Sequence, residues 1–240
     1  MRLIFIITAT IIALGGSSQS AIAQKFKVSP VITKSYADTP YYNKMVRNAL
    51  KNKPARFDFM KLRILYARTR QYDPIGEAAL KTINDFAYIV LHDEDPERAA
   101  GALFAYQAEV AKHLAHIDVV LLALSLARED KRFGRPEFFE WMRDGLIKTV
   151  VISGDGYTLN GAYDVITLSE EVILFNRINF QKNETIPVRE GIIHYNMHDG
   201  EDVQSGRKRT VFVNTSIPMK HLELLQLEQK KTFTLDIGKQ

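Results

Sequence analysis

The chain has 240 residues, 46% of them hydrophobic, and its 32 Lys and Arg exceed its 28 Asp and Glu by four. This apolar fraction is enough for a buried core, which excludes a disordered chain, and so small and scattered an excess of charge argues against a nucleic-acid partner. The absence of cysteine excludes disulfides, thiolate catalysis and a lipid on an N-terminal cysteine.

The first 23 residues have the pattern of a secretory signal peptide. Arg2 precedes an apolar run from Leu3 to Leu14, and small residues follow up to Ala21-Ile22-Ala23. The run is about 12 residues long, whereas a helix needs roughly 20 to cross the hydrocarbon core of a membrane. We therefore expect cleavage between Ala23 and Gln24 rather than a retained anchor. The mature protein is expected to be exported, periplasmic or secreted, with no stable membrane insertion.

After a linker over residues 24–39, residues 40–152 have the hydrophobic spacing of helices. Apolar side chains recur every three or four residues, and capping residues with proline mark several ends. Helices are predicted to begin near residues 40, 57, 75, 96, 117 and 136, the second of them running to Tyr72. The third and fourth, then the fifth and sixth, recur at about 38 to 40 residues, which predicts antiparallel pairs of the tetratricopeptide kind.

From Tyr157 the pattern changes to that of strands. Strands are predicted over residues 162–167, 172–180, 192–197, 210–215 and 232–237, with a helix over 218–229. The third and fourth strands would form a hairpin whose loop holds Asp199-Gly200 and Ser205-Gly206. The basic cluster Arg207-Lys208-Arg209 follows as a solvated loop or, alternatively, a contact with a polyanion. The fold class predicted is α+β, in which residues 153–240 form a small antiparallel sheet with a covering helix.

The segment Ser153-Gly154-Asp155-Gly156 joins the two halves. Two glycines beside an acid suit a sharp turn, in which Asp155 accepts hydrogen bonds from its own backbone. The alternative is a functional acid, because pockets commonly form at such junctions and Glu170 and Glu171 follow closely. Three carboxylates could bind a hard cation or act as an acid and base pair. Both interpretations stay open at the level of sequence.

Two histidine pairs have the spacing of metal ligands. His113 and His116 could share one helix face, although the sequence indicates no third ligand and a capping or hydrogen-bonded histidine explains the pair as well. His194 and His198 share one side of a predicted strand, where surface polar residues are the alternative. No cofactor is predicted, because the chain lacks the zinc-protease, nucleophile-elbow, phosphate-loop and dinucleotide motifs.

Several segments carry a resemblance to a known family. Around the junction they are Leu146-Ile147-Lys148-Thr149-Val150-Val151-Ile152-Ser153-Gly154-Asp155-Gly156, then Ala162-Tyr163-Asp164-Val165-Ile166, then Glu170-Glu171. Earlier in the chain they are Ala115-His116 and the stretch 57–74, which contains Leu62-Arg63, Tyr66 and Tyr72-Asp73-Pro74. Over roughly residues 57–217 the chain resembles the uncharacterised bacterial family of secreted proteins that is numbered 4919 among the domains of unknown function. Val172 stands where that family usually has an aromatic residue. The resemblance implies this architecture and export, and it brings no activity, cofactor or catalytic residue.

Stacked helix pairs offer extended surfaces that bind partners without catalytic groups. We therefore predict an exported, non-enzymatic module or scaffold that binds a protein or peptide through its helices. The alternative is a hydrolase or metal-binding enzyme that uses Asp155, Glu170 or Glu171 with His116. In such an enzyme the imidazole and at least two carboxylates should converge at a cavity.

Overall fold

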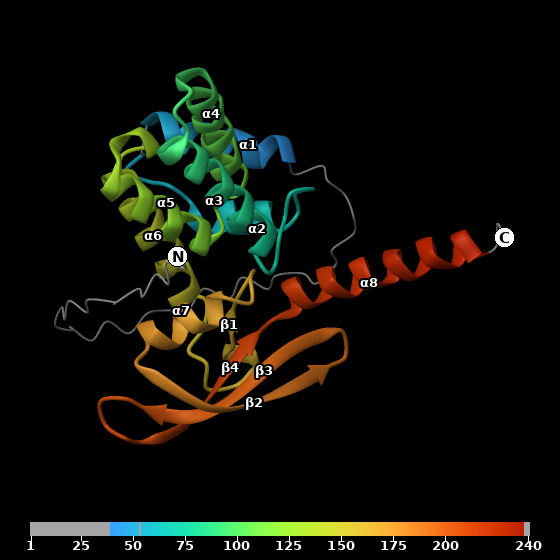
Figure 1. Ribbon diagram of the computed structural model, residues 1–240. Coiled ribbons are helices and arrows are strands. Elements are labelled where there is room, and N and C mark those ends of the chain that lie inside the picture. Colours follow the sequence, from blue (N-terminus) through green and yellow to red (C-terminus); the bar gives the residue numbers. More distant parts are fainter. Residues whose placement is uncertain (1–38, 53, 238–240) are drawn as a thin grey trace, which may run out of the picture.

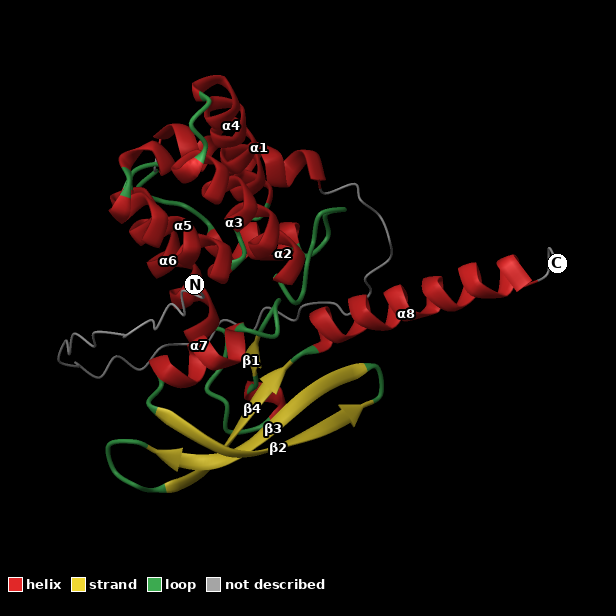
Figure 2. Cartoon of the chain, in the orientation of Figure 1, coloured by secondary structure: helices red, strands yellow, loops and turns green. Residues whose placement is uncertain are grey.

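The computed structural model describes residues 39–52 and 54–237. The predicted signal peptide, its cleavage site between Ala23 and Gln24, and nearly all of the linker lie outside these residues. Helices come first in the described part, and a sheet and a last helix follow (Figures 1 and 2). The predicted α+β class is therefore confirmed. No helix among the described residues combines the length and the apolar character needed to cross a membrane.

The helical half extends to residue 151. Its helices are α1 (Thr39–Asn52), α2 (Phe59–Tyr66), α3 (Glu77–His92), α4 (Pro96–Lys112), α5 (Ile117–Glu129) and α6 (Pro136–Val151), with a short 3-10 helix, η2 (Lys131–Phe133), before α6. Helix α3 packs along α4, and α5 packs along α6, as the repeating pattern predicts. The more specific likeness to tetratricopeptide pairs stays a prediction.

Local side-chain chemistry sets the ends of these helices. Asp95 caps α4, since its Oδ1 accepts hydrogen bonds from the backbone N–H groups of Glu97 (3.0 Å) and Arg98 (3.5 Å). Helix α2 ends at Tyr66 rather than at the predicted Tyr72. There the hydroxyl of Thr69 donates to the Tyr66 carbonyl at 2.7 Å, and the backbone N–H of Thr69 bonds the same carbonyl, so the chain turns.

The sheet is mixed rather than antiparallel throughout. It contains β1 (Tyr163–Asp164), β2 (Phe180–Glu190), β3 (Ile193–Asp202) and β4 (Lys208–Asn214) in the order β1-β4-β3-β2. Strand β1 runs parallel to β4, and the other pairs are antiparallel. The predicted hairpin is confirmed as β3 and β4, but Asp199-Gly200 lies inside β3 and not in the loop. A 3-10 helix, η3 (Leu159–Gly161), precedes β1.

Two predicted strands are wrong and one strand was missed. Residues 172–180 mostly form helix α7 (Glu170–Arg177), and 232–237 belong to the long helix α8 (Ser216–Ile237). The buried side chains of α7 are Glu170, Leu174 and Phe175, which share one helix face, while Val172 is exposed. Apolar residues that alternate over so short a segment fit both periods, and packing decides between them. The predicted strand over 162–167 shortens to β1.

Strand β2 has no hydrophobic signal because its side chains are largely exposed on both faces. It lies at one edge of the sheet, contains Pro187, and has a register shift between Lys182 and Glu184. Alternation of apolar residues is the signal by which strands are recognised, so a strand that buries neither face escapes it.

One continuous hydrophobic core joins the helices to the sheet; it includes Leu62 and Met142 from the helices and Leu174 and Val213 from the second half. Helix α7 covers the sheet, and the ring of its Phe175 lies 5.2 Å from that of Phe180, centroid to centroid. The predicted covering helix over 218–229 is therefore not the one that covers the sheet. It belongs to α8, which contacts β3 and then extends away from the body (Figure 1).

Candidate functional site

Asp155 forms the sharp turn that its glycine neighbours predict. Its Oδ1 accepts a hydrogen bond from the backbone N–H of Tyr157 at 3.0 Å, and its own N–H donates to the Gly161 carbonyl at 2.9 Å. A Cβ on Gly154 would lie 2.5 Å from the Ala162 carbonyl oxygen, so only glycine fits where the turn meets the η3 segment. The residue Asp155 is exposed, and its hydrogen bonds are local. This geometry favours the structural interpretation of the turn.

Glu170 is completely buried and pairs with an arginine from the helical half. Its Oε2 lies 2.7 Å from Nη2 of Arg63, a residue that is only 1% exposed, and the backbone N–H of Ile166 donates to the same oxygen at 2.7 Å. The ion pair connects α2 to the first turn of α7, across 107 positions of sequence. Because both charges are removed from water, each depends on the other for compensation.

The Arg63 guanidinium has further acceptors around it. Its Nη2 donates to the Asp164 carbonyl at 3.1 Å, and its Nη1 lies 3.4 Å from Oγ1 of Thr149 on α6. The hydroxyl of Tyr72 donates to the Ile166 carbonyl close by. We call Arg63, Tyr72, Thr149, Asp164 and Glu170 the junction cluster. It draws on α2, α6, β1 and α7, and it holds the helices to the sheet.

Burial also acts on the Asp164 side chain of this cluster. It raises the pKa of the carboxyl to about 6, although the side-chain amide of Asn214, 2.9 Å from Oδ1, and the Arg63 charge both favour the ionised form. Because the folded pKa is raised above the unfolded value, this carboxyl stabilises the fold at acidic pH, and the contribution is lost as the pH rises toward neutrality.

Glu171 faces a different set of partners from its neighbour Glu170. Its Oε1 accepts a hydrogen bond from Asn196 at 2.7 Å, and its Oε2 lies 3.5 Å from Nε2 of His198 on β3. The other ring nitrogen of His198 lies 3.0 Å from Oγ1 of Thr185, which is directly opposite on β2. These contacts fasten the start of α7 to the sheet, beside the ring contact between His198 and Phe175 at 4.7 Å.

His116 is a buried histidine that lacks hydrogen-bond partners in the described part of the chain. It is 0% exposed, and neither ring nitrogen has a hydrogen-bond partner among the described residues. The ring abuts Gly76, where an added Cβ would lie 2.6 Å from Cε1, and its Nδ1 is 3.9 Å from the Asp118 carboxylate. Burial lowers the pKa of His116, while the negative charges of Asp118, Glu170 and Asp73 oppose that effect.

His113 has partners of its own. Its Nδ1 lies 2.8 Å from the Tyr66 hydroxyl, and its Nε2 is 3.3 Å from the Glu109 carboxylate one turn earlier on α4. Burial lowers its pKa, and the Glu109 charge opposes the shift. His194 and His198 also have separate neighbours, since Nε2 of His194 is 3.3 Å from Glu223 of α8.

The three predicted acids therefore serve three separate contacts, with the Tyr157 backbone, with Arg63 and with Asn196. Over residues 39–52 and 54–237, no three His, Asp or Glu side chains are grouped as a metal site would require. The junction cluster can hold the helical half to the sheet, and its Asp164 can respond to protonation. Asp155 contacts its own turn rather than His116 or Glu170. Of the three acids in the enzyme alternative, only Glu170 is among the charges that act on His116, and Glu170 is itself paired with Arg63.

Within the junction cluster only Glu170 was a candidate from sequence, and its partner Arg63 is the most important residue that reasoning from sequence alone missed. A signal was present, because Arg63 follows Leu62 in a helix whose remaining positions are mostly apolar. A cation on a buried helix face requires an acidic partner. The sequence does not show that Glu170, far along the chain, supplies it.

The low pKa of His116 predicts a dependence of stability on pH. The unfolded imidazole takes up a proton near pH 6.5, and the folded one only at lower pH, so the free energy of unfolding should fall as the pH drops below about 6.5. His116→Gln should flatten this slope between pH 7 and pH 5 in urea denaturation. His92→Gln, at the exposed end of α3, is the control and should leave it unchanged. Equal slopes in all three proteins would contradict the prediction.

Comparisons of the chain with protein families, with curated proteins and with solved structures find no match. The fold and the site themselves define the class: an α+β protein in which a buried ion pair connects the helical half to a mixed sheet.

Proposed function

We propose that this chain is an exported, non-enzymatic module that binds a helical segment of another protein through helix α4. The signal-like N-terminal sequence supports export, and the junction motif supports membership in the family that the sequence resembles. The observation that carries the proposal is Phe104, which is 76% exposed in the middle of α4. An exposed aromatic ring at the centre of a patch is a common anchor of protein interfaces.

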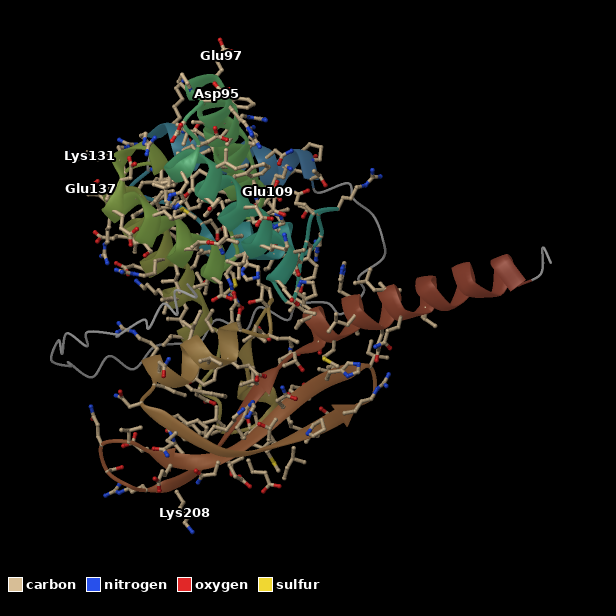
Figure 3. All side chains as sticks on the ribbon, in the orientation of Figure 1. Asp95, Glu97, Glu109, Lys131, Glu137 and Lys208 are labelled. Atoms are coloured by element: carbon tan, nitrogen blue, oxygen red, sulfur yellow. The ribbon has the colours of Figure 1, made fainter. Side chains whose placement is uncertain are left out.

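The surroundings of Phe104 are suited to a neighbouring helix. Ala100, Gly101 and Ala108 are exposed at helical spacing around it, and residues 99–108 carry no charge. We call Ala100, Gly101, Phe104 and Ala108 the α4 stripe. Its helix lies in the part of the molecule farthest from the sheet, and Glu97 in its first turn points outward there (Figure 3). A knob beside small residues lets two helices approach closely.

Gly101 gives a second reason to look for an external partner. A glycine inside a helix costs about 1 kcal/mol relative to alanine. In α6, Gly145 has an internal explanation, because a Cβ there would overlap the ring of Phe59. A Cβ on Gly101 would meet nothing within 4 Å. No described part of the fold requires this glycine, whereas a partner helix that packs closely across the α4 stripe would benefit from it.

The test combines crosslinking with two substitutions. A photoreactive amino acid at Gln107, exposed beside the stripe, should form an adduct with one partner in the producing cells, and the same group at Lys182 on β2 should not. With that partner purified, Phe104→Ala should weaken binding about 10- to 100-fold. Gly101→Ala should raise the free energy of unfolding by about 1 kcal/mol while weakening binding.

Tyr157→Ala is the matched control, because Tyr157 is 66% exposed but lies near the junction. It should leave affinity unchanged within twofold. An adduct that Phe104→Ala does not reduce would contradict the proposal, as would an adduct formed only with a second copy of this chain. A destabilising Gly101→Ala would show that the fold itself needs the glycine.

A further inference from the structure

The sheet has an apolar surface on the side away from helix α7. Successive residues of a strand point to opposite faces, and directly paired residues of antiparallel strands share a face. Asn196 and His198 of β3 both contact Glu171 of α7. Tyr195 and Met197 alternate with them and therefore lie on the other face. The strand register adds neighbours from β2 and β4, and we call the apolar set the outer sheet face: Ile186, Val188, Tyr195, Met197 and Phe212.

The outer sheet face is partly open to solvent. Ile186 is 37% exposed, and the side chains of Val188, Met197 and Phe212 are partly exposed around the buried Tyr195. Helix α7 packs on the opposite side of the sheet, as Figure 2 shows. The side of an antiparallel sheet that faces water is ordinarily polar. Adjacent apolar side chains on such a side therefore indicate a surface on which another molecule packs.

Acidic side chains surround the outer sheet face. The register places four of them on the same side of the sheet: Glu184, Glu190, Asp199 and Glu201. Lys208, directly opposite Glu201, is the one cation that the described strand pairs place there, and it points away from α7 in Figure 3. Four acids against one lysine leave this side with an excess of negative charge.

The other basic residues of these strands do not balance that charge. By register, Lys182 and Arg189 belong to the α7 side of the sheet. Arg209 is on that side too, since its guanidinium carbon lies 5.3 Å from the centroid of the Phe180 ring. Arg207 lies in the hairpin turn before β4. The outer sheet face thus has a negative rim, although the whole chain carries a net charge of +4.

We propose that the outer sheet face binds an amphipathic helix of a partner protein, with apolar residues on its buried side and Lys or Arg beside them. A helix already covers the opposite side of the sheet, and a second one would complete a three-layer arrangement. The negative rim selects a partner with basic flanks. It disfavours a second copy, whose identical face would bring acid against acid, and an anionic lipid surface. The surface is separate from the α4 stripe and does not depend on it.

Two synthetic helical peptides of about 18 residues, or five turns, test the proposal. One has leucine on one face with lysine beside it, and the other has glutamate in place of lysine. The lysine peptide should bind at one site per chain and shift the amide NMR signals of β2, β3 and β4. The glutamate peptide should bind at least about tenfold more weakly. Failure of the lysine peptide to bind, or equal binding of the two peptides, would overturn the proposal.

Substitutions locate the contact on the protein. Ile186→Ser, on an exposed edge strand, should keep the fold and weaken binding of the lysine peptide about 5- to 10-fold through lost apolar burial. Glu184→Gln should weaken binding and reduce its dependence on salt. Ile152→Ser is the matched control, since Ile152 is 52% exposed beside the junction, and it should change affinity less than twofold. Equal losses in Ile152→Ser and Ile186→Ser would overturn the proposal.

Further measurements separate this surface from the other possible occupants. Phe104→Ala in the α4 stripe should leave peptide binding unchanged, and a loss there alone would place the peptide on α4 and overturn the proposal. Sedimentation equilibrium should find a monomer, and vesicles of phosphatidylglycerol should leave the chain unbound. A dimer, or vesicle binding, that Ile186→Ser abolishes would assign the face to a second copy or to lipid and would also overturn it.

Discussion

Glu170→Gln should lower the free energy of unfolding by about 3–5 kcal/mol, because it leaves the Arg63 guanidinium buried without its counter-charge. Arg63 is 1% exposed and its carboxylate partner 0%, so water cannot replace the lost charge. The neighbouring change Glu171→Gln is the matched control. Glu171 is 12% exposed by side chain and bonds the Asn196 amide, so its loss should cost about 1 kcal/mol. Urea denaturation at pH 7 measures both.

The double variant Arg63→Met with Glu170→Gln separates the pair from its surroundings. It removes both charges, so it should be less destabilised than the sum of the two single variants. Part of the loss should remain, because the Asp164 carbonyl and the Thr149 hydroxyl lose their donor. A loss below about 1 kcal/mol in Glu170→Gln would contradict the role given to the ion pair.

Gly154→Ala should destabilise the protein by about 3 kcal/mol through steric overlap alone. The new Cβ would lie 2.5 Å from the Ala162 carbonyl oxygen and overlap that of Gly161, and both are backbone atoms that cannot rotate away. The turn that joins α6 to the η3 segment would have to open. Thermal and urea unfolding of the purified variant measure the loss.

Gly206→Ala provides the comparison for this second prediction. Gly206 has a φ of +64° and open space around it, so alanine there carries only the cost of a left-handed backbone, about 1 kcal/mol. A greater loss at Gly206 than at Gly154 would show that backbone conformation, and not crowding, governs these turns. Asp155→Asn keeps the acceptor for the Tyr157 N–H and should be nearly neutral in the same assay.

The helical half could be predicted well because its signals are local. Proline and apolar spacing mark the start of α4 and α6 within a residue, and Asp95 adds an acidic cap at α4. The sheet half was harder. Helix α7 has only eight residues, too few for its period to separate it from a strand, and β2 leaves most of its side chains exposed on both faces. The β2 strand forms because β3 pairs with it, and that information is not local to its own sequence.

The candidate site also combines features that local sequence predicts with features that depend on contacts between distant segments. The turn at Asp155 was predictable from its glycines, since the geometry of a tight turn depends on adjacent residues. The partnership of Arg63 with Glu170 was not, because it depends on how α2 and α7 meet in three dimensions. The small and aromatic residues of the α4 stripe could be seen in the sequence, but their exposure could not. An alanine-rich helix is compatible with either a buried or an exposed face.

The outer edge of β2 has a consequence for how this protein behaves when concentrated. An open edge of eleven residues would ordinarily invite strands from other molecules to add to it and grow into fibrils. Pro187 lacks a backbone donor, the irregularity between Lys182 and Glu184 bends the strand, and Arg189 adds charge near its end. These are devices that discourage intermolecular strand addition, so the long edge is compatible with a chain that stays dispersed in a crowded compartment.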